Sequence, residues 1–476
     1  MTLLNLYITT APTSVMVGQT RKKGHGLSMA TVKEDEQLLS DFDKLRLEKE
    51  EHIVLKNVDQ TFDFPYLTDL RTVKHVKESK VMFLLRGLPG SGKTTIVSKL
   101  QYVYPSSVKC SADDFFFVKG GYRFDAARLK DAHQWCQGKA QHACESGAPV
   151  VIIDNTNVQH WEMHFYTNLA HRTNYTVITV IPKTSWRFSP DVLARRNKHG
   201  VSEDILREKL HQFENKAPVY YGWFLTEEAS KDVRFIAKHL FEECQKCFPD
   251  YSRSILDTYT PTKYQKPSQV NEKGQLELHF PWKSAELLHC TSKFCNKGRA
   301  LHASEYHSRQ DVADNVGKAF RLEIVGFTFS QNTVAGRICL NEEQRALFDK
   351  PEEKERDDVI ARNKAVNARL AHLSRYHTGI NNKKPSSAAL TSKSASLPPP
   401  EGFGRSAHLT VCCSEGVRNN HAIYDLLDIC DKESAGEVGH RMRVTGGEAM
   451  YLGEGFCVVY LYRPIYVTTL FSPYHV

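Results

Sequence analysis

The chain has 476 residues, of which 41% are hydrophobic and 25% are charged, and it carries a formal net charge of +8. This length exceeds what one hydrophobic core usually serves, so we expect two domains with accessory segments, and the composition excludes a collagenous or largely disordered chain. No stretch approaches the about 18 apolar residues of a membrane-spanning helix, and the twelve cysteines follow no disulfide framework, so the sequence predicts a cytoplasmic protein.

The first half of the chain is expected to contain a flexible leader, residues 1–60, and then an α/β domain, residues 75–248. Residues 81–85, 150–153 and 175–181 are short apolar runs, which are typical of strands buried on both faces of a parallel sheet. Amphipathic stretches lie between these runs. The alternation predicts a doubly wound sheet with helices on both faces.

A phosphate-binding motif follows the first of these runs directly. The segment Gly87-Leu-Pro-Gly-Ser-Gly-Lys-Thr94 matches GxxxxGK[ST] in full and lies between a predicted strand and a predicted helix. Backbone N–H groups of such a loop wrap nucleotide phosphates, the lysine reaches the β/γ oxygens, and the threonine hydroxyl ligates Mg²⁺. The motif therefore predicts ATP or GTP bound with Mg²⁺. The residues expected to bind are Gly87, Gly90, Ser91, Gly92, Lys93 and Thr94.

Two acidic positions are expected to complete this P-loop site. Asp154 ends the strand 150–153, where its carboxylate would hold Mg²⁺ together with Thr94. Ser111-Ala-Asp113 resembles the motif that carries the general base of polynucleotide-kinase-like proteins, and Asp154-Asn-Thr-Asn157 resembles their DxTN run. The resemblance implies that Asp113 meets an acceptor hydroxyl.

Three further polar residues near this site have two interpretations each. Asp114 is either a second catalytic acid or a helix N-cap, and we favour the N-cap. Arg195 and Arg196 open a basic segment where a lid would close on the phosphates. The alternative for both arginines is an exposed basic helix end.

The pattern of apolar runs along the chain changes near residue 250. Shorter apolar runs such as residues 319–325 and 455–461 predict a second, α+β domain at residues 255–476. Residues 342–400 are expected to be a basic, Ser/Pro-rich insertion within it, because they begin with a charged run and end in Ser, Ala and Pro.

The surplus of positive charge belongs to this insertion. Residues 359–400 contain seven Lys and Arg and no Asp or Glu, which leaves about +1 for the other 434 residues. Val359, Val366, Leu370 and Leu373 could line one face of a basic amphipathic helix that binds a partner or a membrane, although a solvated helix on a flexible loop is favoured. We expect a tethered basic segment whose contacts with RNA or a membrane surface are salt-sensitive.

Two His-x-Thr motifs carry the chemistry of the second domain. His289-Cys-Thr291 and His408-Leu-Thr410 each lie on a predicted strand. Side chains at i and i+2 of a strand face the same way, so two such strands side by side would gather two imidazoles and two hydroxyls around one phosphate. Histidine titrates in the range that suits either a general base or a general acid, and the hydroxyls could stabilise developing charge. A lone histidine on a strand is more often structural.

The chain resembles the 2',3'-cyclic-nucleotide 3'-phosphodiesterases of myelin and their regeneration-induced relatives in fish nerve. The resemblance extends from about residue 64 to residue 474 apart from the insertion. It rests on the strings LRGLPGSGK (85–93), YGWFL (221–225), LHCTSKFC (288–295) and AHLT (407–410).

The resemblance implies a fold, an activity and further site residues. The fold is a P-loop kinase-like domain joined to a two-histidine phosphoesterase domain. The implied reaction is hydrolysis of nucleoside 2',3'-cyclic phosphates, or of RNA 2',3'-cyclic phosphate ends, to 2'-phosphates, with no metal at the phosphodiesterase site. His289 would be the acid and His408 the base. Phe294 would pack against the nucleotide base and Tyr220 would lie near the domain junction, while core packing is the alternative for both.

Three departures from the family limit what the resemblance implies. The insertion of residues 342–400 makes the connection between the two motifs longer than the family's, and it is expected to leave the fold intact because a longer surface loop costs little closure entropy. The family has an arginine two positions before the second histidine, but here Arg405 lies three before His408 and Ser406 takes that place. Arg405 is nevertheless the arginine that we expect to bind the substrate here. The family ends in a prenylated cysteine box, which is not found at 474–476, so any membrane contact is expected to be peripheral and without a lipid anchor.

Two other classes of function compete with the enzyme. The first is a membrane- and cytoskeleton-associated protein that binds tubulin or RNA, as the family's associations imply. The second is an RNA-repair polynucleotide kinase and phosphodiesterase. A wild type without cyclic phosphodiesterase activity would favour the first class. Transfer of phosphate to RNA would favour the second.

Overall fold

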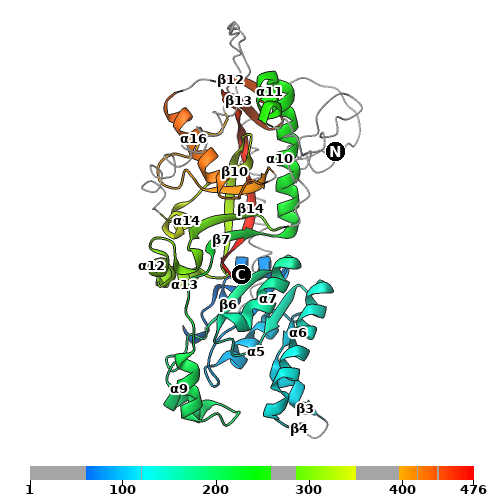
Figure 1. Cartoon of the computed structure of the whole chain (residues 1–476), viewed down its shortest axis with the longest axis vertical. Helices are drawn as coiled ribbons and strands as arrows, with labels where there is room; N and C mark the ends of the chain where they lie inside the picture. Colours follow the sequence, from blue (N-terminus) through cyan, green and yellow to red (C-terminus); the bar gives the residue numbers. More distant parts are fainter. Residues whose placement is uncertain are drawn as a thin grey trace, which may run out of the picture.

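The protein consists of two lobes arranged along its long axis (Figure 1). The computed structural model describes residues 60–118, 121–258, 286–349, 396–414, 416–436 and 439–475. The leader as far as residue 59 lies outside these residues. So do residues 350–395 of the predicted insertion, including the stretch around Val359 to Leu373.

A parallel sheet of four strands forms the centre of the first lobe. These strands are β1 (Val81–Leu85), β2 (Val108–Cys110), β5 (Val150–Ile153) and β6 (Thr176–Val180), in the spatial order β2-β5-β1-β6. Every residue of β1 is buried, which confirms the strand predicted there. The carboxyl ends of all four strands meet at one edge, which is where ligands bind in open α/β sheets.

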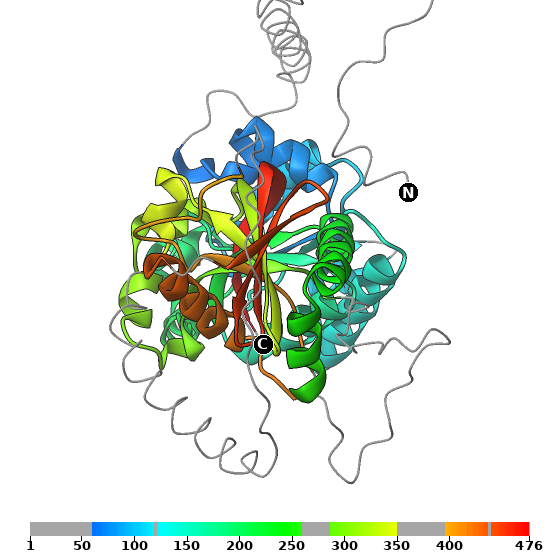
Figure 2. The ribbon, with the colours of Figure 1, turned by 90° about the horizontal axis from the view of Figure 1, so that it is seen from above.

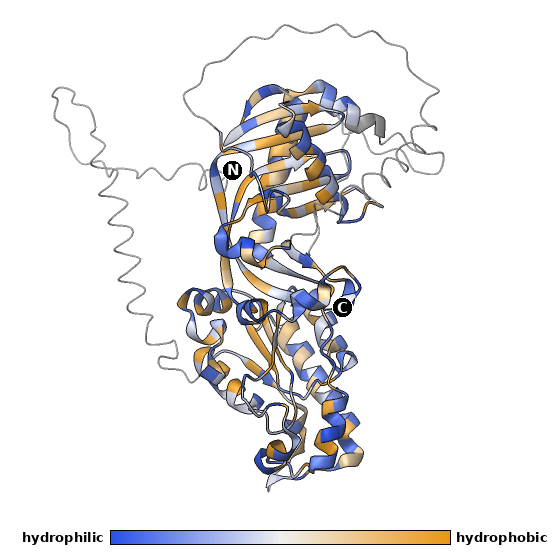
Figure 3. Cartoon of the chain, turned by 90° about the vertical axis from the view of Figure 1, so that its left-hand side faces the viewer, coloured by the Kyte–Doolittle hydropathy of each residue, from blue (hydrophilic) through white to orange (hydrophobic). Residues whose placement is uncertain are grey.

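Helices cover both faces of this sheet, and buried apolar residues form a core on each face. The hydropathy colouring of Figure 3 shows that the strands of this lobe are largely hydrophobic. The main helices are α5 (Lys93–Val103), α6 (Leu129–Glu145), α7 (His160–Arg172), α8 (Pro190–Arg196) and α9 (Glu203–His211). Two more, α3 (Pro65–Thr68) and α4 (Leu70–Lys77), precede β1, and their side chains Tyr66, Leu67 and Val76 are fully buried against it. The lobe therefore begins near residue 60 and not at 75.

The second lobe is built on an antiparallel sheet of eight strands. Its spatial order is β12-β13-β14-β7-β8-β11-β10-β9, and it closes on itself because β9 also pairs with β14. The strands are β7 (Tyr220–Leu225), β8 (His289–Phe294), β9 (Ala319–Phe329), β10 (Thr333–Cys339), β11 (His408–Cys413), β12 (His440–Val444), β13 (Gly447–Gly453) and β14 (Phe456–Tyr474). Strand β14 is much longer than the run predicted at 455–461, because its two halves pair with different neighbours.

The boundary between the lobes lies between α9 and β7, not near residue 250. Strand β7 pairs with β8 and β14, and helix α10 (Glu227–Cys247) buries Val233, Ala237 and Phe241 in the core of the second sheet. Seen from above, α10 and α16 (His421–Ser434) flank β14 on opposite sides (Figure 2). The apolar run of β7 looks like a parallel strand in sequence, because burial on both faces removes the alternation that would distinguish the two sheet types.

The start of the predicted insertion belongs to the folded body. Helix α14 (Glu342–Leu347) begins with a capping box of Asn341 and Gln344, and Leu347 and Phe348 are buried in the core of the second lobe. The remaining short elements are β3 (Phe117–Val118), β4 (Gly121–Tyr122), α11 (Pro249–Thr258), α12 (Ala303–His307) and α13 (Gln310–Asn315).

The two lobes pack directly on each other. The carboxyl-terminal end of β14 lies against β6, and the Ser472 hydroxyl donates to the Val177 carbonyl. The backbone N–H of Ala319 donates to the Thr72 hydroxyl at 2.9 Å, and Ala319 and Leu470 extend the core of the first lobe. Within the described residues, no helix is both long and apolar enough to cross a membrane.

Candidate functional site

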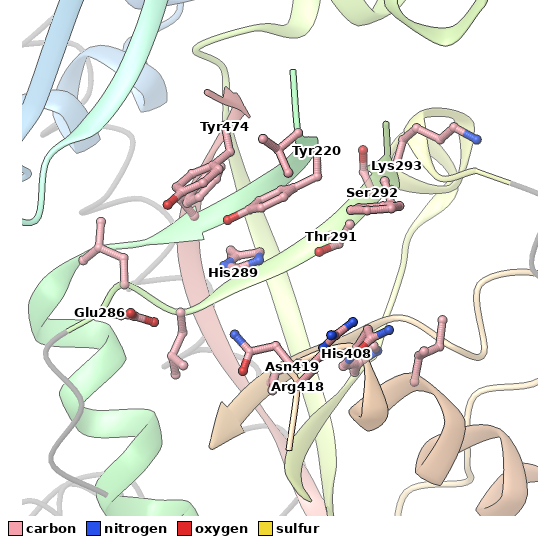
Figure 4. A pocket seen from close by; sticks show the side chains of 18 of the residues that line it. Tyr220, Glu286, His289, Thr291, Ser292, Lys293, His408, Arg418, Asn419 and Tyr474 are labelled. Carbon is pink, nitrogen blue, oxygen red and sulfur yellow. The ribbon is translucent and has the colours of Figure 1, made fainter. Parts of the chain in front are cut away.

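Strands β8 and β11 are neighbours, and they bring the two His-x-Thr motifs together. Cys290 and Leu409 lie opposite each other in the antiparallel register and are buried in the core. Because side chains alternate along a strand, the residues on either side face away from that core. His289, Thr291, His408 and Thr410 line one cavity of about 1400 Å³ (Figure 4).

Each imidazole of the pair is held by the carbonyl group two residues before it. The Nδ1 atom of His408 lies 2.8 Å from the Ser406 oxygen, which requires a proton on Nδ1 and leaves Nε2 without one. The His289 ring hydrogen-bonds the Leu287 carbonyl. Burial lowers the pKa of both rings, that of His289 to about 4, with the charge of His408 as a further cause. Without a bound anion both rings are therefore neutral near pH 7.

Two aromatic rings contact His289. Tyr220 stacks on it with ring centroids 4.6 Å apart, and the Phe224 centroid lies 5.3 Å away. Gly222 lies between them on β7. A Cβ atom there would come within 2.7 Å of the Cys290 carbonyl oxygen, so this close approach of β7 and β8 needs glycine. Tyr220 thus contacts the predicted acid directly.

The other side chains predicted at this cavity differ in position. Phe294 lines the cavity and remains 55% exposed, so its ring is available to a ligand. Arg405 is not among the described residues that line it, and its charge instead acts on Cys430 of α16. Arg418 and Asn419 lie beside His408 (Figure 4). Sequence patterns did not identify Arg418 and Asn419, because these residues follow the second His-x-Thr motif in a loop that no pattern connects to the cavity.

The P-loop wraps the amino end of α5 as expected. The Lys93 amine donates to the carbonyls of Gly87 at 2.9 Å and Leu88 at 3.0 Å, and burial lowers its pKa to about 8. Asp154 is buried, which raises the pKa of its carboxyl group, while the charge of Lys93 opposes that rise. Gly90 and Gly92 have positive φ angles of 81° and 103°, a conformation that favours glycine.

Helix α8 packs against this loop. A Cβ atom on Gly90 would lie 3.0 Å from the Leu193 oxygen, and the Trp186 indole donates to the Gly90 carbonyl at 3.3 Å. Arg196 lies over the Trp186 ring, 4.0 Å from its centroid, and Arg195 pairs with Asp191 within α8. The basic segment therefore contacts the P-loop through Trp186, while Arg195 is mostly exposed.

The acidic residues after β2 face two different sets of partners. Asp113 lies 3.7 Å from His199, whose other ring nitrogen is 3.4 Å from the Tyr122 hydroxyl. Asp114 is not a helix N-cap. Its carboxylate pairs with Lys109 at 2.9 Å and Lys139 at 3.9 Å, because Ser111 takes the N-cap position of the short helix that follows.

Two asparagines of the DNTN run hold the P-loop edge in place. The Asn155 side chain accepts from the backbone of Ala112 at 3.0 Å, next to Asp113. The Asn157 amide donates to the Leu85 carbonyl at 2.8 Å, at the end of β1. The sequence resemblance pointed to this run but did not reveal these positioning roles.

The fold and the two sites define a two-domain protein with a phosphate-binding loop and a separate His–Thr cavity. The family model of 2',3'-cyclic nucleotide 3'-phosphodiesterase (CNP or CNPase) matches residues 217–476, and an AAA domain model matches residues 82–218. These ranges meet at the boundary between α9 and β7. The chain therefore belongs to the 2',3'-cyclic nucleotide 3'-phosphodiesterase family.

Curated relatives agree with this assignment. The 2',3'-cyclic-nucleotide 3'-phosphodiesterases of Rattus norvegicus and Mus musculus are each 28% identical to the chain over 416 residues. These residues cover 87% of this chain and 87% of each relative. NEDD4-binding protein 2 of Homo sapiens is 46% identical over 134 residues, which cover 28% of this chain and 8% of that protein.

Proposed function

We propose that the chain hydrolyses 2',3'-cyclic phosphates of nucleotides or RNA ends to 2'-phosphates in the cavity between β8 and β11. The observation that carries this proposal is the convergence of His289, Thr291, His408 and Thr410 in one cavity of a member of this family. Phe294 at the rim supplies an exposed ring on which a nucleotide base could stack.

The chemistry needs one proton acceptor and one proton donor. One imidazole removes a proton from the attacking water, the new P–O bond forms, and the bond from phosphorus to the 3' oxygen breaks. The other imidazole protonates that departing oxygen. The hydroxyls of Thr291 and Thr410 donate to the non-bridging oxygens, where charge accumulates in the transition state. The Ser406 carbonyl holds Nδ1 of His408, and the Leu287 carbonyl holds the ring of His289. Each contact orients the other ring nitrogen of that histidine.

The phosphate itself decides which imidazole is charged. Burial keeps both rings neutral in the empty cavity, and a phosphate monoanion favours protonation of the ring beside it. The resemblance makes His289 the acid and His408 the base. Because burial lowers the pKa of His289 to about 4, the bound phosphate must favour the protonated form of that ring for it to act as the acid.

Substitution of either histidine tests this function. His289→Ala and His408→Ala are each expected to lower kcat on 2',3'-cyclic NADP or cyclic AMP about 10²- to 10⁴-fold, the usual contribution of a general acid or base. His302→Ala is the matched control, since His302 is exposed, pairs with Glu305 and is not among the described residues that line the cavity. Equal activity of wild type and both variants, or a 3'-phosphate product, would contradict the proposal.

We further propose that the P-loop domain binds ATP or GTP with Mg²⁺. Lys93 would contact the phosphates, and Thr94 and Asp154 supply the oxygen donors that Mg²⁺ prefers. A bound Mg²⁺ would supply positive charge next to the β/γ phosphates. Transfer to a 5'-hydroxyl RNA end is the alternative use of this site, because Asp113 could accept the proton of that hydroxyl. Labelled ATP and 5'-hydroxyl RNA test it: label transfer lost in Lys93→Ala and Asp113→Ala supports a kinase, and no transfer leaves a binding domain.

A further inference from the structure

Four rings form a continuous stack that crosses from the P-loop domain to the phosphodiesterase cavity. His171 stacks on Tyr474 with centroids 4.2 Å apart and planes inclined by 12°. Tyr474 stacks on Tyr220 at 4.7 Å and 7°, and Tyr220 on His289 at 4.6 Å and 13°. Figure 4 shows Tyr474, Tyr220 and His289 one after another along one side of the cavity. We call these four residues the ring column.

The sheet register produces most of this column. Tyr474 and Tyr220 lie directly opposite each other on β14 and β7, so their side chains share a face. His289 lies opposite Phe224 on the next pair of strands, and its ring contacts the rings of Phe224 and Tyr220. His171 comes from the other lobe, where it lies in the last turn of α7.

Tyr474 and His171 hold different positions in the ring column. Tyr474 is the last residue of β14, and a strand end readily frays unless it is tied down. His171 stacks on Tyr474. His171 and its neighbour Arg172 also line the cavity, so the wall of the phosphodiesterase site includes part of the P-loop domain.

We propose that Tyr474 and His171 are positioning residues for the phosphodiesterase reaction, which hold the plane of the His289 imidazole through Tyr220. The P-loop domain thereby completes the catalytic cavity of the other domain. The Leu287 carbonyl restrains one ring nitrogen of His289, but the plane of the ring is restrained by the Tyr220 ring stacked on it. Displacement of a catalytic group by about 1 Å lowers a rate about 10²-fold, so a small loss of order at His289 is measurable. This inference rests on the proposed phosphodiesterase function.

Several titratable groups face His289 and remain in place when His171 is changed. His408 lies across the cavity. Burial raises the pKa of both column tyrosines, Tyr220 and Tyr474, and the Glu286 carboxylate adds to that rise. His171 itself is neutral near pH 7, because burial lowers its pKa to about 4. Its removal therefore changes packing and water access around the column and removes no charge.

The test compares three substitutions in the full chain with 2',3'-cyclic NADP as substrate. His171→Ala is expected to lower kcat about two- to tenfold, the range that one aromatic pair supports, with little change in KM. Water then reaches the column, burial of His289 decreases, and the limb of the kcat–pH profile that reports His289 moves to higher pH. His171→Phe, which keeps a ring, is expected to restore most of the rate. His164→Ala is the control, an exposed histidine on the same helix, and it is expected to behave as wild type.

The outcomes separate this inference from the proposed function. An inactive wild type would refute the phosphodiesterase function itself. Active wild type together with unchanged kcat and pH profile in folded His171→Ala would overturn the positioning role alone. If His171→Ala does not fold, His171→Leu replaces it, because leucine fills the space without a ring. Equal kcat for His171→Leu and His171→Phe would then overturn the inference.

Discussion

Gly222→Ala is the most demanding test of the cavity geometry. The added Cβ would lie 2.7 Å from the Cys290 carbonyl oxygen, whereas such contacts are essentially never shorter than 3.0 Å, so β7 and β8 must separate by at least about 0.3 Å. The oxygen belongs to the backbone of β8 and cannot rotate away. We expect overpacking of this kind to lower the free energy of unfolding by about 1–3 kcal/mol.

The same displacement should lower activity more than stability. Cys290 lies between His289 and Thr291, so movement of its carbonyl shifts both residues that face the cavity. A shift of a few tenths of an ångström should lower kcat about tenfold, given the about 10²-fold loss expected for 1 Å. The assays are urea unfolding and the kcat for 2',3'-cyclic NADP, measured on the same preparations.

Gly336→Ala is the matched control for this substitution. Gly336 lies in the same sheet, on β10 opposite Leu409, but a Cβ there would meet its neighbours at 3.6 Å or more, which is ordinary van der Waals contact. We expect the free energy of unfolding to stay close to that of wild type and kcat to stay within about twofold, because the added methyl fits the available space. If Gly222→Ala behaves like Gly336→Ala, the close approach of β7 and β8 does not constrain the cavity, and the reasoning is refuted.

Three further predictions concern other parts of the chain. Burial lowers the pKa of His75 from 6.5 to about 4, so the unfolded state takes up a proton first and stability falls as the pH drops below 6.5. Urea unfolding should show that wild type loses about 2 kcal/mol more than His75→Leu between pH 7 and pH 5, and equal losses would contradict this. Lys93→Ala should raise the Kd for Mg-ATP about 10- to 100-fold by calorimetry, because a charge-assisted contact is lost, while Lys99→Ala on the same helix should leave it unchanged. Deletion of residues 359–395 removes seven Lys and Arg and no acidic residue, so RNA affinity should fall and the slope of log K against log salt should shrink by up to about 5, with turnover of cyclic NADP unchanged. An unaltered salt slope would show that the segment does not contact phosphates.

Much of the fold and both motifs were predictable from short-range patterns. The GxxxxGK[ST] loop directly follows an apolar strand, and its glycines, lysine and threonine act through the local backbone, so residues 87–94 can be interpreted without tertiary information. The His-x-Thr spacing likewise implies that His289 and Thr291 share one face of a strand. These signals are local because they depend on backbone geometry within a few residues.

The assignment of elements to domains was less predictable. Strand β7 and helix α10 follow the P-loop domain with the same alternation of apolar and amphipathic segments, yet they pack into the second sheet. Burial on both faces makes Tyr220–Leu225 read like a parallel strand. Only the pairing with β8 and β14 distinguishes the two, and pairing between strands distant in sequence leaves no local mark.

The sequence by itself determined which residues we propose to carry the chemistry, since Lys93, His289 and His408 stand in motifs that local backbone geometry explains. Tertiary structure alone decided what surrounds them. It placed Arg418 at the cavity and Arg405 away from it, and it stacked His171 of one domain on Tyr474 of the other. Such contacts join segments hundreds of residues apart, and they arise from sheet register and domain packing, which no periodicity within either segment encodes.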